Sequence, residues 1–362
     1  MELFHRILST AVQGHASDVH IKPGGPIIFR IHQDLVAIEA PTPTPEWVSN
    51  VVENIVPKHF KKRLEEDREV DFSYFVSGVG RFRTNCFQQR GEWCLAMRYV
   101  KAEIPAFEEL GLLPIVKQIA MAPRGIVLVA GATGSGKSTT LAAMIQHINT
   151  TTASHIITLE DPIEFVFDDI KSTIEQREVG LDTLSFNHGL KHILRQDPDI
   201  IMIGEMRDAI SFSASMSCAD TGHLVLSTVH TTNAAQSVSR VLEFFKADER
   251  EQVRKQLAAT LQAVICQRMV PKVGGGVIPA LEILVNTGTV RKLIEENRLD
   301  KLPVAIETAR DDGMQSFNQA LFDLVKERKV TEKDALANAT NAQALEMNFK
   351  GIFLDEGRRI LS

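Results

Sequence analysis

A glycine-rich run at residues 131–138, GATGSGKS, is the part of this sequence with the most specific chemistry. It fits the pattern G-x-x-x-x-G-K-[ST] and lies between an apolar run and a helix-compatible one, which is the context that a phosphate-binding loop requires. Glycines let backbone N–H groups close around phosphates, and the N-terminus of the following helix adds a partial positive charge. The run therefore predicts that the protein binds a nucleoside triphosphate and hydrolyses it.

The ligand expected at this loop is ATP, with Mg²⁺ as cofactor. In such loops the lysine, here Lys137, reaches the β- and γ-phosphates, and the hydroxyl that follows, here Ser138, coordinates the metal. A glycine-rich turn without a ligand is the alternative, and the flanking strand and helix patterns disfavour it. The residues expected to bind the nucleotide are Gly131, Thr133, Gly134, Ser135, Gly136, Lys137, Ser138 and Thr139.

Hydrolysis also requires a group that orients or activates water in line with the γ-phosphate, so carboxylates at strand ends are candidates. The segment LEDPIE ends an apolar run and places Glu160, Asp161 and Glu164 within five residues. Like charges this close are costly at a buried edge unless a cation or a water network receives them. A solvated acidic turn is the alternative for this cluster.

Two further strand ends carry polar side chains. Glu205 directly follows the apolar run at 199–204, and we expect its carboxylate to face the metal. His230 closes the next apolar run, at the carboxyl end, where ligands of parallel sheets collect, so it is a candidate site residue. His223 lies at the opposite end of that run, and we expect it to be a structural residue.

Short, nearly continuous apolar runs dominate the chain after residue 124, and such runs are typical of strands that are buried on both faces. Helix-compatible segments separate them, so the pattern predicts an α/β domain with a parallel sheet covered by helices. We expect 250–269 and most later segments to be helical, with one further apolar run at 277–284. The predicted strands are 125–131, 155–160, 199–204 and 223–230.

The first hundred residues have a different pattern. A helical period at 2–13 leads into two apolar runs around Gly24 and Gly25, then a helical segment to about Glu66, then three extended runs at 70–76, 80–88 and 93–100. We predict a small α+β domain with an antiparallel sheet at 1–100, a linker rich in proline at 101–114, and the larger domain at 115–362, whose C-terminal portion is helical.

Length and charge limit the class of protein. A chain of 362 residues suggests two domains. Its net charge of −6 and pI near 6.0 do not provide the overall positive charge that nonspecific binding to nucleic acid requires. We therefore do not expect nucleic acid as a partner. The basic stretch at 58–63 is followed by acidic residues and reads as a solvated helix face. No run approaches the roughly 18 apolar residues of a membrane span, so we expect a cytoplasmic protein with peripheral membrane contact only.

Taken together, these motifs resemble those of the secretion-type motor ATPases, and most closely the type IV pilus retraction ATPases of the PilT/PilU group. GATGSGKSTTLAAMI is similar to the Walker A motif of that family, LEDPIEF to its Asp box, GEMRD to its Walker B motif and TGHLVLSTVHTTNA to its His box. SDVHIKPG and GRFRTNCF resemble its N-terminal PAS-like domain. The resemblance implies a RecA-like core that follows a PAS-like domain.

The resemblance also implies roles for single residues. Glu164 matches the glutamate that activates the attacking water, Glu205 the one that holds Mg²⁺ through water, and His230 the residue that senses the γ-phosphate. Family members form ring-shaped homohexamers in which the N-terminal domain of one subunit closes over the nucleotide of its neighbour. Arg83 and Arg98 match the arginines offered in trans, and ordinary exposed strand arginines are the alternative.

The implied activity is ATP hydrolysis that drives pilus retraction and twitching motility through an inner-membrane platform protein, with peripheral association of the ring at the inner membrane. A long N-terminal extension and a four-cysteine zinc module, both usual in assembly enzymes, are missing from the sequence, and this favours retraction. The motif AIRNLIRE of retraction enzymes is matched only partly by TVRKLIEE at 289–296. An accessory paralogue that joins another retraction ATPase, a nucleotide-gated switch and a different secretion-type ATPase therefore stay as alternatives.

Overall fold

Grouping of residues by spatial proximity divides the chain into two units. The computed structural model describes residues 1–32, 34–100 and 104–353, so positions 101–103 of the predicted linker lie outside the described residues. The first unit comprises residues 1–100 with the short segments 161–166 and 178–182, and the second comprises the remainder. The two elements that follow position 103 are the short helices α4 (Phe107–Leu110) and α5 (Pro114–Ala120), which begin inside the predicted linker or directly at its end.

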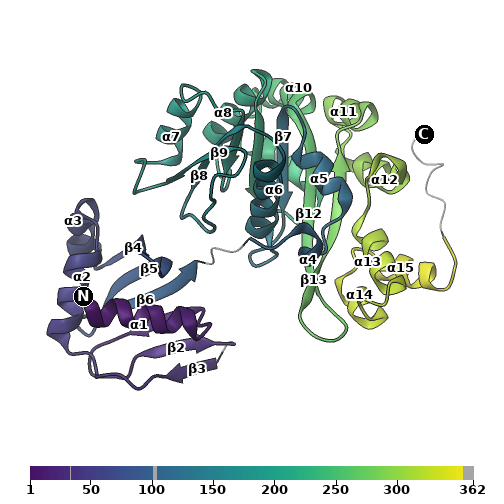
Figure 1. Ribbon diagram of the computed structural model, residues 1–362. Helices are drawn as coiled ribbons and strands as arrows, with labels where there is room; N and C mark the ends of the chain where they lie inside the picture. The colour runs from purple at the N-terminus through teal and green to yellow at the C-terminus, as the bar shows by residue number, and fades with distance from the viewer. Residues whose placement is uncertain (33, 101–103, 354–362) are drawn as a thin grey trace. The chain divides into compact units, whose positions relative to one another are not determined.

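The first unit is built on a six-stranded sheet in the order β3-β2-β1-β6-β5-β4. Every neighbouring pair in it is antiparallel, as the sequence predicted. Its strands, labelled in Figure 1, are β1 (Asp18–Ile21), β2 (Ile28–Ile31), β3 (Asp34–Ala37), β4 (Glu69–Val76), β5 (Gly80–Gln89) and β6 (Glu92–Val100).

One face of this sheet forms the core of the first unit. Alternate residues such as Phe82 and Met97 are buried there with the apolar stripes of α1 (Glu2–Gln13) and α2 (Pro45–Ile55). The other face carries the polar residues of the same strands. The predicted single helix up to about Glu66 is in fact two helices, because Pro57 separates α2 from α3 (Lys58–Asp67) and forces the preceding residue out of helical geometry.

The second unit contains a seven-stranded sheet in the order β13-β12-β7-β11-β10-β8-β9. The pairs β12–β7, β7–β11, β11–β10 and β10–β8 are parallel, which confirms the predicted parallel sheet, and β12 and β13 pair in antiparallel fashion. The strands are β7 (Gly125–Ala130), β8 (His155–Glu160), β9 (Thr173–Glu178), β10 (Ile200–Ile203), β11 (Leu224–Val229), β12 (Leu261–Pro271) and β13 (Val277–Val285).

Helices cover this sheet. Helices α6 and α8 pack against β7, and in the C-terminal portion α13 packs against β13 and α14 against β12 (Figure 1). The helices of the second unit after α5 are α6 (Lys137–Thr151), α7 (Phe186–Ile193), α8 (Ala209–Asp220), α9 (Ala234–Glu243), α10 (Arg250–Thr260), α11 (Gly288–Glu295), α12 (Leu302–Thr308), α13 (Phe317–Lys326), α14 (Glu332–Asn338) and α15 (Ala342–Phe349), with single 3₁₀ turns at Leu299–Lys301 and Arg310–Asp312.

The prediction of a helix over 250–269 is wrong in its second half. Helix α10 ends at Thr260, and the next eleven residues form β12, a strand that pairs with β7 on one side and β13 on the other and whose apolar side chains are mostly buried. A short apolar run fits a buried helix or a buried strand equally well, and pairing with distant strands decides between them here. Strand β9 was not predicted, because its sequence TIEQRE is polar and it lies at the sheet edge.

None of the helices in the described ranges combines the length and the apolar character of a membrane span. The four cysteines are free and buried. Burial raises the pKa of the Cys86 thiol to about 12 and that of Cys218 to about 11.

The core of the first unit can be tested with two phenylalanines of the same sheet. Phe82 is fully buried, whereas Phe75 is 64% exposed. Phe82→Ala removes a ring from a packed core, and we expect it to lower the free energy of unfolding by about 3–5 kcal/mol, measured by urea denaturation. Phe75→Ala is the matched control, with an expected change within about 0.5 kcal/mol. Equal losses in the two variants would contradict the described packing.

Candidate nucleotide site

The loop at residues 131–138 joins the end of β7 to the start of α6, as the sequence predicted. Gly134 and Gly136 have φ of +79° and +86°, a region that side chains rarely tolerate. A Cβ atom on Gly131 would lie 2.4 Å from the Ser135 Oγ atom. Gly136 caps α6 without a side-chain hydrogen bond, so the first N–H groups of the helix remain available to an anion.

The buried polar atoms of the loop fit phosphate groups. The Lys137 ammonium donates hydrogen bonds to the carbonyl oxygens of Gly131, at 2.9 Å, and Ala132, at 3.0 Å. The Ser135 hydroxyl is buried and has no hydrogen-bond partner among the described residues, and a Cβ atom on Gly134 would meet nothing within 4 Å. A cation, a spare donor and an open glycine backbone together form a cradle for a phosphate chain. Thr133 lies on the exposed part of this loop, and Ser138 and Thr139 are half-buried in the first turn of α6.

Hydrogen bonds across the sheet hold the carboxyl ends of three parallel strands together. The Gly204 amide donates to the Leu159 carbonyl at 2.8 Å, and the Thr228 hydroxyl donates to the Gly204 carbonyl at 2.6 Å. The Met206 amide donates in turn to the Thr228 carbonyl at 3.2 Å. Residues that follow β10 and β11 are therefore held at one edge of the sheet, where β11 is the neighbour of β7 and β10 the neighbour of β11.

Two predicted site residues meet at this edge. Glu205 follows β10 and His230 follows β11, and the His230 Nε2 atom lies 3.3 Å from the Glu205 Oε1 atom. The other carboxylate oxygen of Glu205 accepts from the Arg207 guanidinium at 2.7 Å. The Glu205 side chain is 21% exposed, so its charge is partly desolvated and is balanced by a permanent cation. Sequence reasoning missed Arg207, although a cation two positions after a strand-end carboxylate is a usable signal.

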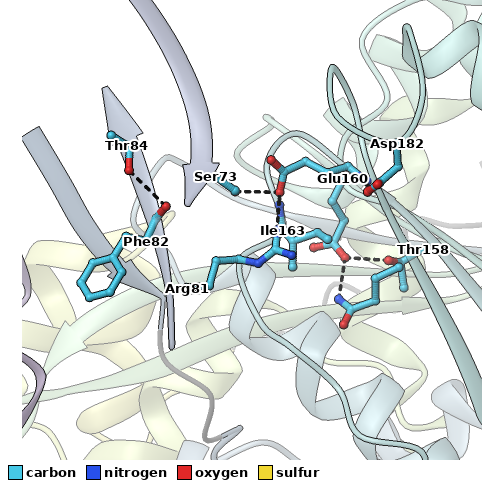
Figure 2. A network of polar contacts seen from close by, with 10 residues as sticks. Ser73, Arg81, Phe82, Thr84, Thr158, Glu160, Ile163 and Asp182 are labelled. Carbon is cyan, nitrogen blue, oxygen red and sulfur yellow. Dashed lines mark hydrogen bonds and ion pairs between the residues drawn. The ribbon is translucent and has the colours of Figure 1, made fainter. Parts of the chain in front are cut away.

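The acidic cluster at the end of β8 divides into two parts. The Glu160 carboxylate is buried in the second unit, where its Oε1 atom accepts from the Thr158 hydroxyl at 2.7 Å and from the Gln176 amide at 3.2 Å (Figure 2). Asp161 and Glu164 are exposed and belong to segment 161–166 of the first unit. The structure thus brings Glu205 and His230 together and assigns Glu164 to the other unit.

Gln267 is a second residue that the sequence analysis missed. Its side-chain oxygen accepts from the Thr140 hydroxyl of α6 at 3.0 Å, and both side chains are buried. Its side-chain nitrogen would lie 3.1 Å from a Cβ atom on Gly136, so it contacts the phosphate loop. The wrong assignment of 261–269 to a helix concealed it. A polar residue at the end of an apolar run was the same signal that identified His230.

The two predicted arginines share the polar face of the first sheet. Arg83 in β5 and Arg98 in β6 are directly opposite each other in the register, and both are exposed. Arg98 donates through Nε to the Asp18 carboxylate at 2.9 Å, and Arg30 lies 4.0 Å from the other Asp18 oxygen. Asp18 therefore offsets part of the positive charge on this face.

His223 has the surroundings of a structural residue. Its Nδ1 atom lies 2.9 Å from the Cys218 carbonyl oxygen and 3.1 Å from the Thr221 hydroxyl, at the amino end of β11. These partners close the turn between α8 and β11, as expected.

Comparison with known proteins decides the family. Residues 1–332 match the type II/IV secretion system proteins. The chain belongs to this family. It is 41% identical over 339 residues to the type IV pilus retractation ATPase PilT of Pseudomonas aeruginosa, an alignment that covers 94% of this chain and 98% of that one. The type IV pilus ATPase PilU of the same organism is 37% identical over 348 residues, with 96% and 91% covered.

A solved structure gives the same result for the fold. The crystal structure of the pilus retraction motor PilT with bound ADP matches this member of the type II/IV secretion family with a TM-score of 0.88 and 42% sequence identity, and covers 94% of this chain and 98% of that one. The predicted α/β fold, the resemblance to retraction ATPases and the assignment to ATP-hydrolysing enzymes are confirmed. As a member of this family, the chain is a nucleotide-binding protein.

Binding of nucleotide should depend on the ammonium of the loop. We expect Lys137→Ala to weaken binding of ADP by roughly 10- to 100-fold, because charge-assisted hydrogen bonds to phosphate are lost, as measured by calorimetric titration. Lys255→Ala removes a lysine of the exposed Glu251 pair on α10 and is the matched control, with unchanged affinity. Equal affinity of the Lys137 variant and the wild type would exclude the loop as the phosphate site.

Proposed function

We propose that this protein is a ring-forming motor ATPase that hydrolyses ATP to drive type IV pilus retraction, in which pilin subunits are removed from the pilus base and cells move by twitching. The observation that supports it best is the contact between Glu205 and His230 at the sheet edge next to the phosphate loop. This arrangement lets a carboxylate and a γ-phosphate sensor respond to one nucleotide. Similarity to PilT over nearly the whole chain supports the task that the hydrolysis serves.

In this mechanism, side chains and backbone N–H groups of the phosphate loop and of α6 bind the nucleotide and fix its position. The Lys137 ammonium leaves the loop carbonyls and pairs with the phosphates, and the N–H groups at the start of α6 donate to them. The Ser138 hydroxyl and the Glu205 carboxylate would hold Mg²⁺, which would supply positive charge to the transferring phosphoryl group. Glu164 activates the attacking water, and His230 reports loss of the γ-phosphate to Glu205.

The active form in this proposal is a homohexamer. Arg83 and Arg98 stabilise the charge on the phosphates bound by a neighbouring subunit, and their exposure on the polar face of the first sheet is compatible with that role. The domains proposed are a PAS-like domain at 1–100, a linker at 101–114 and the RecA-like domain at 115–362. Their relative rotation would act on an inner-membrane platform protein from the cytoplasmic side.

A second candidate is an accessory retraction ATPase that works beside a principal paralogue. The 37% identity to PilU over 96% of this chain favours it, as does the partial motif at 289–296, which forms most of α11. Both candidates require an intact site. They differ in whether the protein moves pili without its paralogue.

Purified protein should hydrolyse ATP, and removal of Mg²⁺ with EDTA should abolish the activity. We expect Glu205→Ala and Glu164→Gln each to lower kcat by about 10²- to 10⁴-fold, because metal holding and water activation are lost. Phosphate release is the measurement, and Glu251→Ala on the exposed face of α10 is the control. No activity in the wild type would indicate a nucleotide-gated switch instead.

Deletion of the gene tests whether the protein retracts pili or assembles them. Cells that lack a retraction motor should carry more surface pili and lose twitching movement, since pilus assembly continues without removal of pilin. Counts of pili by electron microscopy and twitching zones on agar measure this, with a plasmid-borne copy as the control. Bald cells would contradict retraction, and excess pili with partial movement would favour the accessory role.

A further inference from the structure

Glu178 is a buried carboxylate outside the site described above. It ends β9, its side chain is 4% exposed, and one of its oxygens, Oε2, accepts three hydrogen bonds within the first unit. The donors are the Arg81 guanidinium at 2.8 Å, the Ser73 hydroxyl at 2.8 Å and the Ile163 backbone amide at 3.1 Å (Figure 2). A buried carboxylate needs such a set of donors, because removing its charge from water is costly.

The cation of this network comes from the N-terminal sheet. Arg81 lies in β5 and Ser73 in β4, on the polar face that also carries Arg83. The Arg81 side chain is only 19% exposed, unlike the exposed Arg83 on the same strand. The Arg81–Glu178 pair is therefore largely shielded from water and from salt, and is harder to break than a surface pair.

The third donor connects the network to a proposed catalytic residue. Ile163 is buried and directly precedes Glu164 in segment 161–166. Its amide is fixed by the same Glu178 oxygen that Arg81 contacts. The Glu178 backbone amide also donates to the Asp182 carboxylate at 2.8 Å, so the backbone of Glu178 is held within its own segment while its side chain holds Ile163. The backbone that carries Glu164 thus depends on Glu178, and Glu178 depends on Arg81.

We propose that Arg81 is a positioning residue for ATP hydrolysis: through Glu178 and the Ile163 amide, it fixes the backbone from which Glu164 acts on water. This inference rests on the proposed function of Glu164. Arg81 itself contacts no reacting atom in this scheme, in contrast to the role proposed for Arg83 and Arg98. The N-terminal sheet then supplies a support for the catalytic carboxylate within the same subunit.

The test is steady-state ATP hydrolysis by the full-length protein. A displacement of about 1 Å in a reacting group can cost up to about 100-fold in rate, so we expect Arg81→Ala to lower kcat by roughly 10- to 100-fold. The KM for ATP should change by less than about twofold, because the phosphate loop is untouched. Arg81→Lys should retain part of the rate, and Ser73→Ala should lower kcat less than Arg81→Ala does.

A matched control and a double variant separate positioning from general damage. Arg63→Ala removes an arginine from an exposed ion pair with Asp67 on α3, and should leave kcat unchanged. Glu178→Gln keeps an acceptor of the same shape. In the double variant it should add little to the fall in kcat caused by Arg81→Ala, because both substitutions break the same Arg81–Glu178 interaction. Hydrogen exchange at the Ile163 amide should become faster in Arg81→Ala, while exchange in the phosphate loop stays as in the wild type.

The outcomes distinguish this inference from the proposed function. An active wild type whose kcat survives Arg81→Ala, or losses that add fully in the double variant, would overturn the positioning role and leave the ATPase proposal intact. A rise in KM without a fall in kcat would overturn it as well. Inactive wild-type protein would refute the proposed function itself, while exchange at Ile163 would still report whether Arg81 holds this segment.

Discussion

Parallel pairing of β12, β7, β11, β10 and β8 is the constraint on which the candidate site depends. Because these strands run in one direction, their carboxyl ends lie at one edge of the sheet, and whatever follows each strand is delivered there. The register pairs the last residue of β7 with the last of β11, so the phosphate loop and His230 begin at the same level. Glu205 follows β10 in the same way, whereas Gln267 lies within β12, one residue after Cys266, which pairs with the last residue of β7. Packing of the buried apolar side chains stabilises this alignment of the strand ends, and the alignment places the polar groups near one another.

The chain uses two kinds of carboxylate. Glu205 is partly exposed, and its two oxygens contact Arg207 and His230, partners that such a group can exchange at moderate cost. Glu178 is enclosed, and loss of any one donor would leave a desolvated charge. The first arrangement suits a group that changes partners during a reaction cycle. The second suits a group that must not move.

The sequence alone was sufficient where a local pattern carries the information. The position of the glycine-rich loop between β7 and α6, the buried strands of the parallel sheet and the strand-end positions of Glu205 and His230 were predicted, because motif and apolar run are visible within a few positions. Strand β12 was lost because a buried helix and a buried strand have the same local pattern, and Gln267 was lost with it. The Arg81–Glu178 pair joins residues 97 positions apart, and a local sequence pattern cannot predict a contact between residues so far apart in the chain.

The hydrogen bonds of Lys137 bear on how readily nucleotide can leave the phosphate loop. Lys137 already donates to two carbonyl oxygens of its own loop, so its charge is not left bare when no anion is present. In the proposed mechanism, nucleotide binding would therefore exchange one set of acceptors for another and would not require a buried, unsatisfied ammonium. Such an exchange would favour product release, a step that often limits turnover in enzymes. A motor ATPase that empties its site on every cycle would benefit from a loop lysine that has hydrogen-bond partners with and without nucleotide.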